Sequence, residues 1–539
     1  MYLLIVDTTG IQPYIFGSNR LQENIGASYL VDQATRNWAL EAVPTPNNIV
    51  DIKTSQLNES IHINKDNSLA AEVIYSGGGN FVVLLKDEDK AKEFTRKLSR
   101  KVLSDAPNLQ IVIAMEKFTW AESLCKTSQK VFQKLAEQKQ CRSISNPLLG
   151  LGVTASCQST GLPAVSYYKD YPVSAEILAK LDAVDKANKR LTDTFSSLLK
   201  NSPFTFPKEF DDMGRSYGEH SYIAVVHADG NGMGKIIEKI GDNFSQPTQN
   251  REYINHIRAF SKNVEQASKK ALENTLYSLI NSVEPVNNHY NIIHRNKQEQ
   301  RLTEIHLKDK NLPFRPIVFG GDDVTFVCDG RLGISLAIKY LQEFECQTKN
   351  QNILNNGGKP GLTACAGISI VKTHYPFARA YELAEELCKS AKSFRKDEKT
   401  DDSCLDWHFA LSGLSGKIET IRKREYEVKE GKLHWRPVTL HKNISQKIHS
   451  WQTVKKALEA FQSSDWATRR NKIKALREAL REGKDDIEQF INKFLDEDGL
   501  PELELSDADY RKKGWHNKEC PYFDAIEMMD WFIPLKEEV

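Results

Sequence analysis

The chain has 539 residues, a formal net charge of +1, 40% hydrophobic residues and 27% charged residues. This is the composition of an ordinary globular protein, and the length corresponds to roughly three to four domains. The sequence contains no run of about 18 apolar residues, which excludes a transmembrane helix. The balanced charge excludes a global electrostatic field, so any contact with RNA must use a local patch.

The cysteines and the N-terminus indicate the compartment. Nine cysteines are scattered without a C-x-x-C pair, so their spacing does not support a zinc site. Several lie in apolar segments, as Cys365 does, which favours reduced thiols in a cytoplasmic protein. The N-terminus MYLLIVD has no basic flank and reaches an Asp at position 7. It predicts a first strand rather than a signal peptide.

Residues 1–115 have the pattern of one α/β unit. The expected elements are a strand at 1–7, a helix at 24–39, a strand–turn–strand at 71–85, a helix at 87–103 and a strand at 109–115. This order is consistent with a ferredoxin-like βαββαβ sheet.

Residues 216–415 repeat the pattern, with an insertion expected to be helical at about 241–311. The expected elements are a strand at 222–229, a glycine-rich turn leading into a helix, a strand–turn–strand at 316–327, a helix at 332–344, a strand at 362–371 and a helix at 376–393. The fold class is therefore α/β (α+β), with two copies of one architecture. Each copy has a glycine-rich hairpin tip, YSGGGN at 75–80 and FGGDD at 319–323.

The remaining segments are expected to be helical. Residues 116–215 predict a connector of helices and loops, with helices at 118–138 and 174–199. Residues 416–539 carry apolar stripes at helical spacing, which predict a small helical bundle with solvated charged faces.

The most informative segment is PIVFGGDDVTFV, in which Asp322 and Asp323 follow a Gly-Gly turn between two apolar runs. It predicts a β-hairpin with two negative charges at its tip. Beside buried strands such a pair is costly unless a cation neutralises it, and Mg²⁺ or Mn²⁺ suits hard oxygen ligands. The alternative is an ordinary turn, because Gly and Asp are favoured in turns.

Asp229 ends the first strand of the second copy. In a ferredoxin-like sheet this strand lies beside the third, so Asp229 is expected near Asp322 and Asp323. Three carboxylates at one point would hold one or two divalent ions for phosphoryl transfer, and we expect these three residues to be both catalytic and metal-binding. The alternative for Asp229 alone is a helix N-cap.

Glycine-rich loops allow phosphates to approach the backbone closely. The candidate nucleotide-binding residues are Gly320 and Gly321 at the acidic tip, Gly230, Asn231, Gly232 and Gly234 in DGNGMGK, and Gly77, Gly78 and Gly79 at the first tip.

Lys392 is placed to counter a triphosphate, and Lys389 competes for that role. Either lysine would also serve as a partner of the helix dipole. Lys235 is interpreted as a surface lysine and His227 as a packed side chain. No Ser/His/Asp or Cys/His nucleophilic set is evident.

Together, several motifs resemble the CRISPR-polymerase family, the large subunit of type III CRISPR effector complexes. They are DTTGIQPYIF, NRLQENIGASYLV, YSGGGNFVVLL, HADGNGMGK, VFGGDDVTFV and GISIVKTHYPFARAYELAEELCKSAK, which cover about residues 1–115 and 220–410. The sequence is similar, more distantly, to GGDEF diguanylate cyclases.

The resemblance implies two palm domains that form a pseudo-dimer, and synthesis of cyclic oligoadenylate from ATP through 3′–5′ bonds. By this resemblance, Asp229, Asp322 and Asp323 bind two Mg²⁺ ions, and Lys392 contacts the triphosphate. The segment from Gly77 to Asn80 faces a second ATP.

The sequence departs from the family pattern in three respects. No His-Asp dipeptide occurs, so we expect no HD nuclease domain. Only Cys157 echoes a cysteine-paired zinc element, and the C-terminal bundle matches in general character alone. Two alternatives stay open: a cyclic dinucleotide synthase acting alone or as a homodimer, and a non-catalytic, RNA-binding subunit of a CRISPR effector complex. The expected partners are ATP, with RNA, other effector subunits or a second copy as further candidates, and no membrane.

Overall fold

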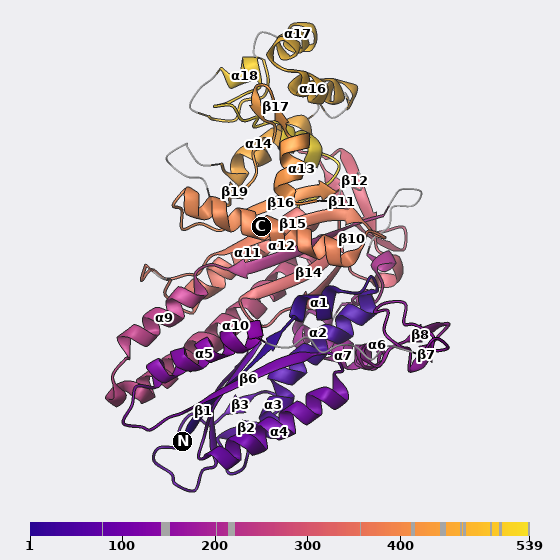
Figure 1. Ribbon diagram of the computed structural model, residues 1–539. Helices are drawn as coiled ribbons and strands as arrows, with labels where there is room; N and C mark the ends of the chain where they lie inside the picture. The colour runs from indigo at the N-terminus through magenta and orange to yellow at the C-terminus, as the bar shows by residue number, and fades with distance from the viewer. Residues whose placement is uncertain are drawn as a thin grey trace.

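Two α/β palms and a helical C-terminal region make up the protein (Figure 1). The computed structural model describes residues 1–536 except 78, 142–150, 201, 214–220, 356, 411–415, 442–448, 464–465, 467–469, 496–498 and 506–508. The first palm, in indigo and violet, lies beneath the second palm, whose strands run from magenta to orange. The predicted fold class is confirmed.

The first palm has the strand order of a ferredoxin-like sheet. Its four antiparallel strands lie in the order β4-β5-β1-β6. Their bounds are β1 Tyr2–Thr9, β4 Ala71–Gly77, β5 Asn80–Leu85 and β6 Gln110–Lys117. The helices are α1 Ile11–Phe16, α2 Leu21–Thr35, α3 Asn37–Ala42, α4 Glu88–Asp105 and α5 Leu124–Cys141. The single helix expected at 24–39 is divided, because Arg36 leaves helical geometry at φ −119° and ψ −88°.

The second palm repeats this order and extends it. Its sheet has the order β13-β14-β9-β15-β16-β19, in which β16 is parallel to β15. The strands are β9 Tyr222–Gly230, β13 Phe314–Val318, β14 Asp323–Asp329, β15 Ala364–Lys372, β16 Cys404–Ala410 and β19 Val438–Thr439. The helices are α9 Met233–Asn243, α10 Asn250–Asn281, α11 Gly333–Asn350 and α12 Phe377–Asp397. Strand β19 lies within the segment that was expected to be a separate helical domain. The domain limits remain our proposal, and those near 216 and 415 lie outside the described residues.

The expectation of a wholly helical insertion at 241–311 is wrong. After α10 the chain forms a three-stranded antiparallel sheet of β10 Val283–Val286, β11 His289–Arg295 and β12 Arg301–His306. The β10–β11 turn is Asn287-Asn288, with φ of 49° and 64°. Two consecutive positive φ angles are typical of a type I′ hairpin turn, for which asparagine is favoured. The Asn-Asn pair was therefore a hairpin signal that the helical interpretation missed.

The connector and the C-terminal region are mainly helical. The connector contains the hairpin β7 Ser166–Tyr168 and β8 Tyr171–Val173, followed by α6 Ala175–Asp182, α7 Val184–Thr194 and α8 Ser196–Leu199. Helices α6 and α7 pack against α2 of the first palm. The C-terminal helices are α13 Ile418–Glu425, α14 Trp451–Phe461, α16 Arg470–Glu482, α17 Lys484–Phe494, α18 Tyr510–Lys513 and α19 Phe523–Met528. Among the described helices, none has the length and apolar character needed to cross a membrane.

A buried ion pair fixes the C-terminal region. Arg436 Nη1 lies 3.1 Å from Asp524 Oδ1, and both side chains are fully buried. Asp524 also accepts hydrogen bonds from the backbone N–H groups of Trp435 and Arg436. Removing one partner would leave the other charge buried without compensation.

We expect Arg436→Ala to lower the free energy of unfolding of the C-terminal region by about 3 kcal/mol, because Asp524 stays buried and loses its countercharge. Urea denaturation followed by tryptophan fluorescence measures this change. Arg470→Ala is the matched control, since the Arg470–Asp530 pair is 67% and 64% exposed. Its effect should stay below about 0.5 kcal/mol. Equal effects of the two variants would contradict the prediction.

Candidate active site

The end of the β13–β14 hairpin brings acidic residues from distant segments together. In the antiparallel pairing of β14 with β9, Asp323 lies directly opposite Asp229. Residues in this position project to the same face of a sheet, with Cβ atoms about 5 Å apart. Asp322 precedes Asp323 at the turn, and its carbonyl oxygen accepts a hydrogen bond from the Gly230 N–H at 3.2 Å. The structure thus places the three predicted carboxylates at one end of the sheet.

The Asp322 side chain packs against Gly230, unlike the side chains of Asp229 and Asp323, which share one face of the sheet. A Cβ on Gly230 would lie 3.0 Å from the Cβ of Asp322, so Asp322 packs over that glycine. Consecutive residues near a strand end alternate between faces, which separates Asp322 from the face shared by Asp229 and Asp323. Within the described residues, no group of three or more His, Cys, Asp or Glu side chains is arranged to hold a metal ion.

The donor chemistry of the site nevertheless suits a divalent cation. Carboxylate oxygens are hard ligands, which Mg²⁺ and Mn²⁺ prefer over sulfur or nitrogen donors. Asp229 and Asp323 are partly exposed, with 39% and 50% of their side chains accessible. Asp229 and Asp323 therefore present two adjacent carboxylates on one accessible face.

Lys392 is the lysine that reaches the acids. Its Nζ lies 2.6 Å from Asp229 Oδ2 and donates to the Gly230 carbonyl at 3.3 Å. Lys389, one turn earlier on α12, instead pairs with Glu385 at 3.0 Å and is 68% exposed. The geometry therefore distinguishes the two lysines, which the sequence had left as alternatives.

The electrostatics of the cluster are those of crowded like charges. Burial and the charges of Asp229 and Asp323 raise the pKa of Asp322 to about 6. Desolvation by the surrounding protein and the charge of Asp229 raise the pKa of Asp323 to about 7, although Lys392 opposes this rise. Burial opposes the charged form of Lys392, but the charge and hydrogen bond of Asp229 outweigh it and raise the Lys392 pKa. The cluster therefore carries more negative charge than its one lysine balances.

The glycine-rich loop after β9 is shaped by its backbone contacts. Asn231 donates from its backbone N–H to the Thr363 carbonyl at 2.8 Å and from its side chain to Thr363 Oγ1 at 3.1 Å. Gly232 has φ +73° at the N-cap of α9, and a Cβ on Gly234 would meet open space. Asn231 thus anchors the loop to the strand region beside the tip. Lys235 is exposed, as interpreted from the sequence.

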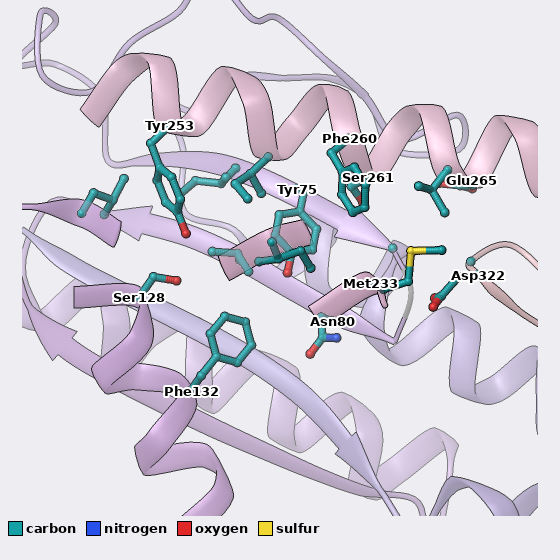
Figure 2. Close-up of a pocket in the computed structure, with 18 of the residues that line it drawn as sticks. Tyr75, Asn80, Ser128, Phe132, Met233, Tyr253, Phe260, Ser261, Glu265 and Asp322 are labelled. Carbon is teal, nitrogen blue, oxygen red and sulfur yellow. The ribbon is translucent and has the colours of Figure 1, made fainter. Parts of the chain in front are cut away.

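The tips of the two palms lie close together and border two cavities. The aromatic cavity, of about 160 Å³, lies between the first palm, α5, α9 and α10, and Figure 2 shows Tyr75, Tyr253 and Phe132 around it. The interpalm cavity, of about 150 Å³, lies between α2, α7 and the two tips. Both cavities are lined by Gly77, Gly320, Gly321 and Asp322. Asn80 lines the aromatic cavity and Gly79 the interpalm cavity, whereas Gly78 lies outside the described residues.

The structure also places residues that sequence reasoning missed. In the first palm, Asp7 lies opposite Asn80, as Asp229 lies opposite Asp323 in the second. Lys139 Nζ lies 2.5 Å from Asp7, and it stands 15 positions after the start of α5, as Lys392 stands 15 after the start of α12. Aligning the two copies from their first strands would have revealed this correspondence.

His227 does more than pack. It is buried, and its Nδ1 lies 3.3 Å from Asp323 Oδ1 and 3.2 Å from Thr325 Oγ1. Burial lowers the pKa of His227, although the charges of Asp229 and Glu385 oppose the shift. A neutral His227 can therefore orient Asp323 through its ring N–H. His227 lies two residues before Asp229 on the same strand, so the sequence already indicated that the two side chains share one face of the sheet.

The sequence of the second palm matches a known protein family. Residues 222–400 match the family described as Cas10/Cmr2, second palm domain. The second palm belongs to the Cas10/Cmr2 family. No curated protein matches the sequence. The Cas10/Cmr2 match spans β9 to α12 and includes all three acids and Lys392.

Solved structures share the fold over nearly the whole chain. One is a chain of the crystal structure of a Csm1–Csm4 cassette in complex with cA3, with 11% identity, a TM-score of 0.50, and coverage of 98% of this chain and 69% of that chain. Another is a chain of the cassette in complex with pppApApA, with 12% identity, a TM-score of 0.51 and the same coverage. At these low identities, the structural similarity shows a common fold and nothing further.

We expect Asp323→Asn to stabilise the metal-free protein at pH 8 but not at pH 5. The pKa of Asp323 in the folded protein is raised to about 7 from an ordinary value of 3.8, so stability present below pH 4 is lost as the pH rises through 7. Asparagine does not ionise. For a half-exposed group the screened effect is about 1 kcal/mol, or about 2 °C in melting temperature.

Thermal unfolding in EDTA across this pH range measures the difference. Asp185→Asn is the control, because that side chain is 95% exposed. Adding Mg²⁺ in excess of EDTA at pH 8 should reduce the difference in melting temperature between wild type and Asp323→Asn. A gap that is independent of pH would contradict the assignment.

Proposed function

We propose that this protein is a metal-dependent nucleotidyltransferase that converts ATP into cyclic oligoadenylate within a type III CRISPR-like defence system. The observation that carries the proposal is the pairing of Asp323 with Asp229, next to Asp322 and Lys392, in a Cas10/Cmr2 palm. The Csm1–Csm4 cassettes that share the fold are complexes with cA3 and with pppApApA, and these ligands support the choice of substrate and product.

Each element of the site has a role in this reaction. Asp229, Asp322 and Asp323 would hold Mg²⁺, which when bound supplies charge neutralisation at the reacting phosphate and the attacking 3′-hydroxyl. Lys392 is positioned beside Asp229, where its cation can meet the triphosphate once the carboxylate is engaged by metal. The tip glycines let the nucleotide approach the backbone, and His227 holds Asp323 in place. Catalysis then consists of positioning and electrostatic stabilisation, and no protein nucleophile is required.

The two cavities supply room for more than one nucleotide. The aromatic cavity offers tyrosine and phenylalanine side chains against which a base can pack, and the interpalm cavity is charged. Both border the acidic tip, so a base in either cavity places its phosphates near Asp322. Two nucleotides must meet at one tip for a 3′–5′ bond to form.

Two other functions are compatible with the fold. A cyclic dinucleotide synthase would use the same acids and differ in product. A non-catalytic, RNA-binding effector subunit would use the palms for binding alone, but the retained acids of the second palm favour catalysis, because the first palm has Asn80 opposite Asp7. We further propose that the partners are ATP and the subunits of a Csm-like complex, with RNA as the trigger.

We expect the double variant Asp322→Asn/Asp323→Asn to reduce product formation from ATP by at least about 10³-fold, because the reacting phosphate loses its metal site. Incubation with Mg²⁺ and ATP, with and without total RNA, followed by mass spectrometry identifies the product. An unchanged melting temperature or a small increase shows that the fold is intact. Normal pyrophosphate release by this variant would refute the proposed chemistry, and a cyclic dinucleotide mass from wild type would select the second function.

We expect Lys392→Ala to lower kcat/KM for ATP by about 10²-fold, since a cation beside the triphosphate is lost. Lys389→Ala is the matched control, one helical turn away on the same helix, and should remain within about twofold of wild type. The measurement is the initial rate of pyrophosphate release. Equal losses in both variants would mean that the helix position, not the contact with Asp229, matters.

A further inference from the structure

Arg36 lies between the tips of the two palms. A Cβ added to Gly77 of the first tip would lie 4.0 Å from Arg36 Nη2, and one added to Gly320 of the second tip would lie 3.9 Å from it. A single guanidinium therefore lies within contact distance of both tips. The break between α2 and α3 occurs at Arg36 itself.

Glu265 of α10 holds this guanidinium and a second cation with one oxygen. Arg36 Nη2 lies 2.9 Å from Glu265 Oε1, and Lys269 Nζ lies 2.8 Å from the same atom. The side chains of Arg36 and Glu265 are each 18% exposed. One oxygen that accepts from a guanidinium and an ammonium at once has the surroundings that proteins give to a phosphate oxygen.

This Arg36–Glu265 pair stands at the boundary between the two cavities. Glu265 lines the aromatic cavity, and Arg36 lines the interpalm cavity. Figure 2 shows Glu265 on α10, on the same side of the aromatic cavity as Phe260 and Ser261. A ligand that extended from one cavity into the other would have to pass the pair.

Among the side chains that are ion-paired around Arg36, cations outnumber carboxylates, and Asp322 and Asp323 also line the interpalm cavity. Arg190 pairs with Asp32, and Arg36 lies 3.4 Å from the same aspartate. The two carboxylates, Asp32 and Glu265, therefore contact three cations, which are Arg36, Arg190 and Lys269. A polyphosphate carries several negative charges and more acceptor oxygens than Glu265, so it can replace Glu265 on both cations.

We propose that Glu265 is a placeholder for phosphate, and that a phosphate group of a bound nucleotide or growing oligonucleotide replaces it on Arg36 and Lys269 and joins the two cavities. The ligand class is a nucleoside polyphosphate or its phosphodiester product. This inference deepens the proposed function and rests on it for the identity of the ligand. It adds an anion site that consists of Arg36 and Lys269, separate from the acids and Lys392.

A purely structural clamp between the palms predicts the opposite result. If the Arg36–Glu265 pair only holds the palms together, neutralising Glu265 loosens the tips and weakens anion binding. If Glu265 is a placeholder, neutralising it releases two cations and strengthens anion binding. The sign of one change in affinity therefore separates the two explanations.

The test is calorimetric titration of the full-length protein with inorganic tripolyphosphate in EDTA. We expect Glu265→Gln to bind tripolyphosphate about tenfold more tightly than wild type. Arg36→Gln should bind no more tightly than wild type, and the double variant Arg36→Gln/Glu265→Gln should lose the gain of Glu265→Gln. The matched control is Glu93→Gln, because Glu93 on α4 also holds two lysines, Lys90 at 2.9 Å and Lys97 at 2.8 Å, away from the tips. Glu93→Gln should change the affinity less than twofold. Glu265→Ala is the second charge-removing variant, and thermal unfolding of every variant reports on folding.

Unchanged or weaker binding by Glu265→Gln and Glu265→Ala, or an equal gain in Glu93→Gln, would overturn the inference. The measurement uses neither turnover nor metal, so it is independent of product formation. Absence of product in wild type together with the expected affinity changes would refute the proposed reaction but leave the anion site intact.

Discussion

The pairing of β14 with β9 is the constraint on which the site depends. It sets Asp323 against Asp229 and leaves Asp322 at the turn, so three carboxylates share the end of one sheet. Such crowding opposes folding near neutral pH, as the raised pKa values of Asp322 and Asp323 indicate. Lys392 balances one charge and leaves an excess that divalent ions or bound cations can neutralise. A strained electrostatic arrangement on an otherwise regular sheet is the pattern found where chemistry takes place.

The first palm carries the same scaffold without that excess. Asp7, Asn80 and Lys139 occupy the positions of Asp229, Asp323 and Lys392, and the Lys139–Asp7 pair is balanced. One carboxylate that is already paired with a lysine has little need of a metal ion. The two palms thus differ in the charge at the paired strand positions, and this difference is consistent with our proposal that catalysis takes place at the second tip.

Sequence reasoning located the acidic tip because its evidence is local. The turn glycines, the flanking β-rich runs and the neighbouring acids are all contiguous, and the ferredoxin-like order then predicts Asp229 beside them. The sheet at 283–306 was missed, since the long helix before it drew the interpretation toward helix. The ion pair of Arg36 with Glu265 joins positions 229 residues apart. No local pattern reports such a contact, because each residue alone resembles a charged surface position.

Helix α10 contacts the first palm at two places that differ in burial. Near its start, Arg258 donates to Glu72 at 2.9 Å and Arg251 to the same glutamate at 2.6 Å, and Glu72 is fully buried in the first palm. Removing one partner of a buried pair of this kind costs about 3–5 kcal/mol. Glu265 is 18% exposed whereas Glu72 is fully buried, so water screens the contact of Glu265 with Arg36 to a greater extent. The contact of α10 with the first palm is therefore more deeply buried near the start of the helix than at the tips. A ligand that replaced Glu265 on Arg36 would exchange the less buried of the two contacts and would leave the pairs of Glu72 in place.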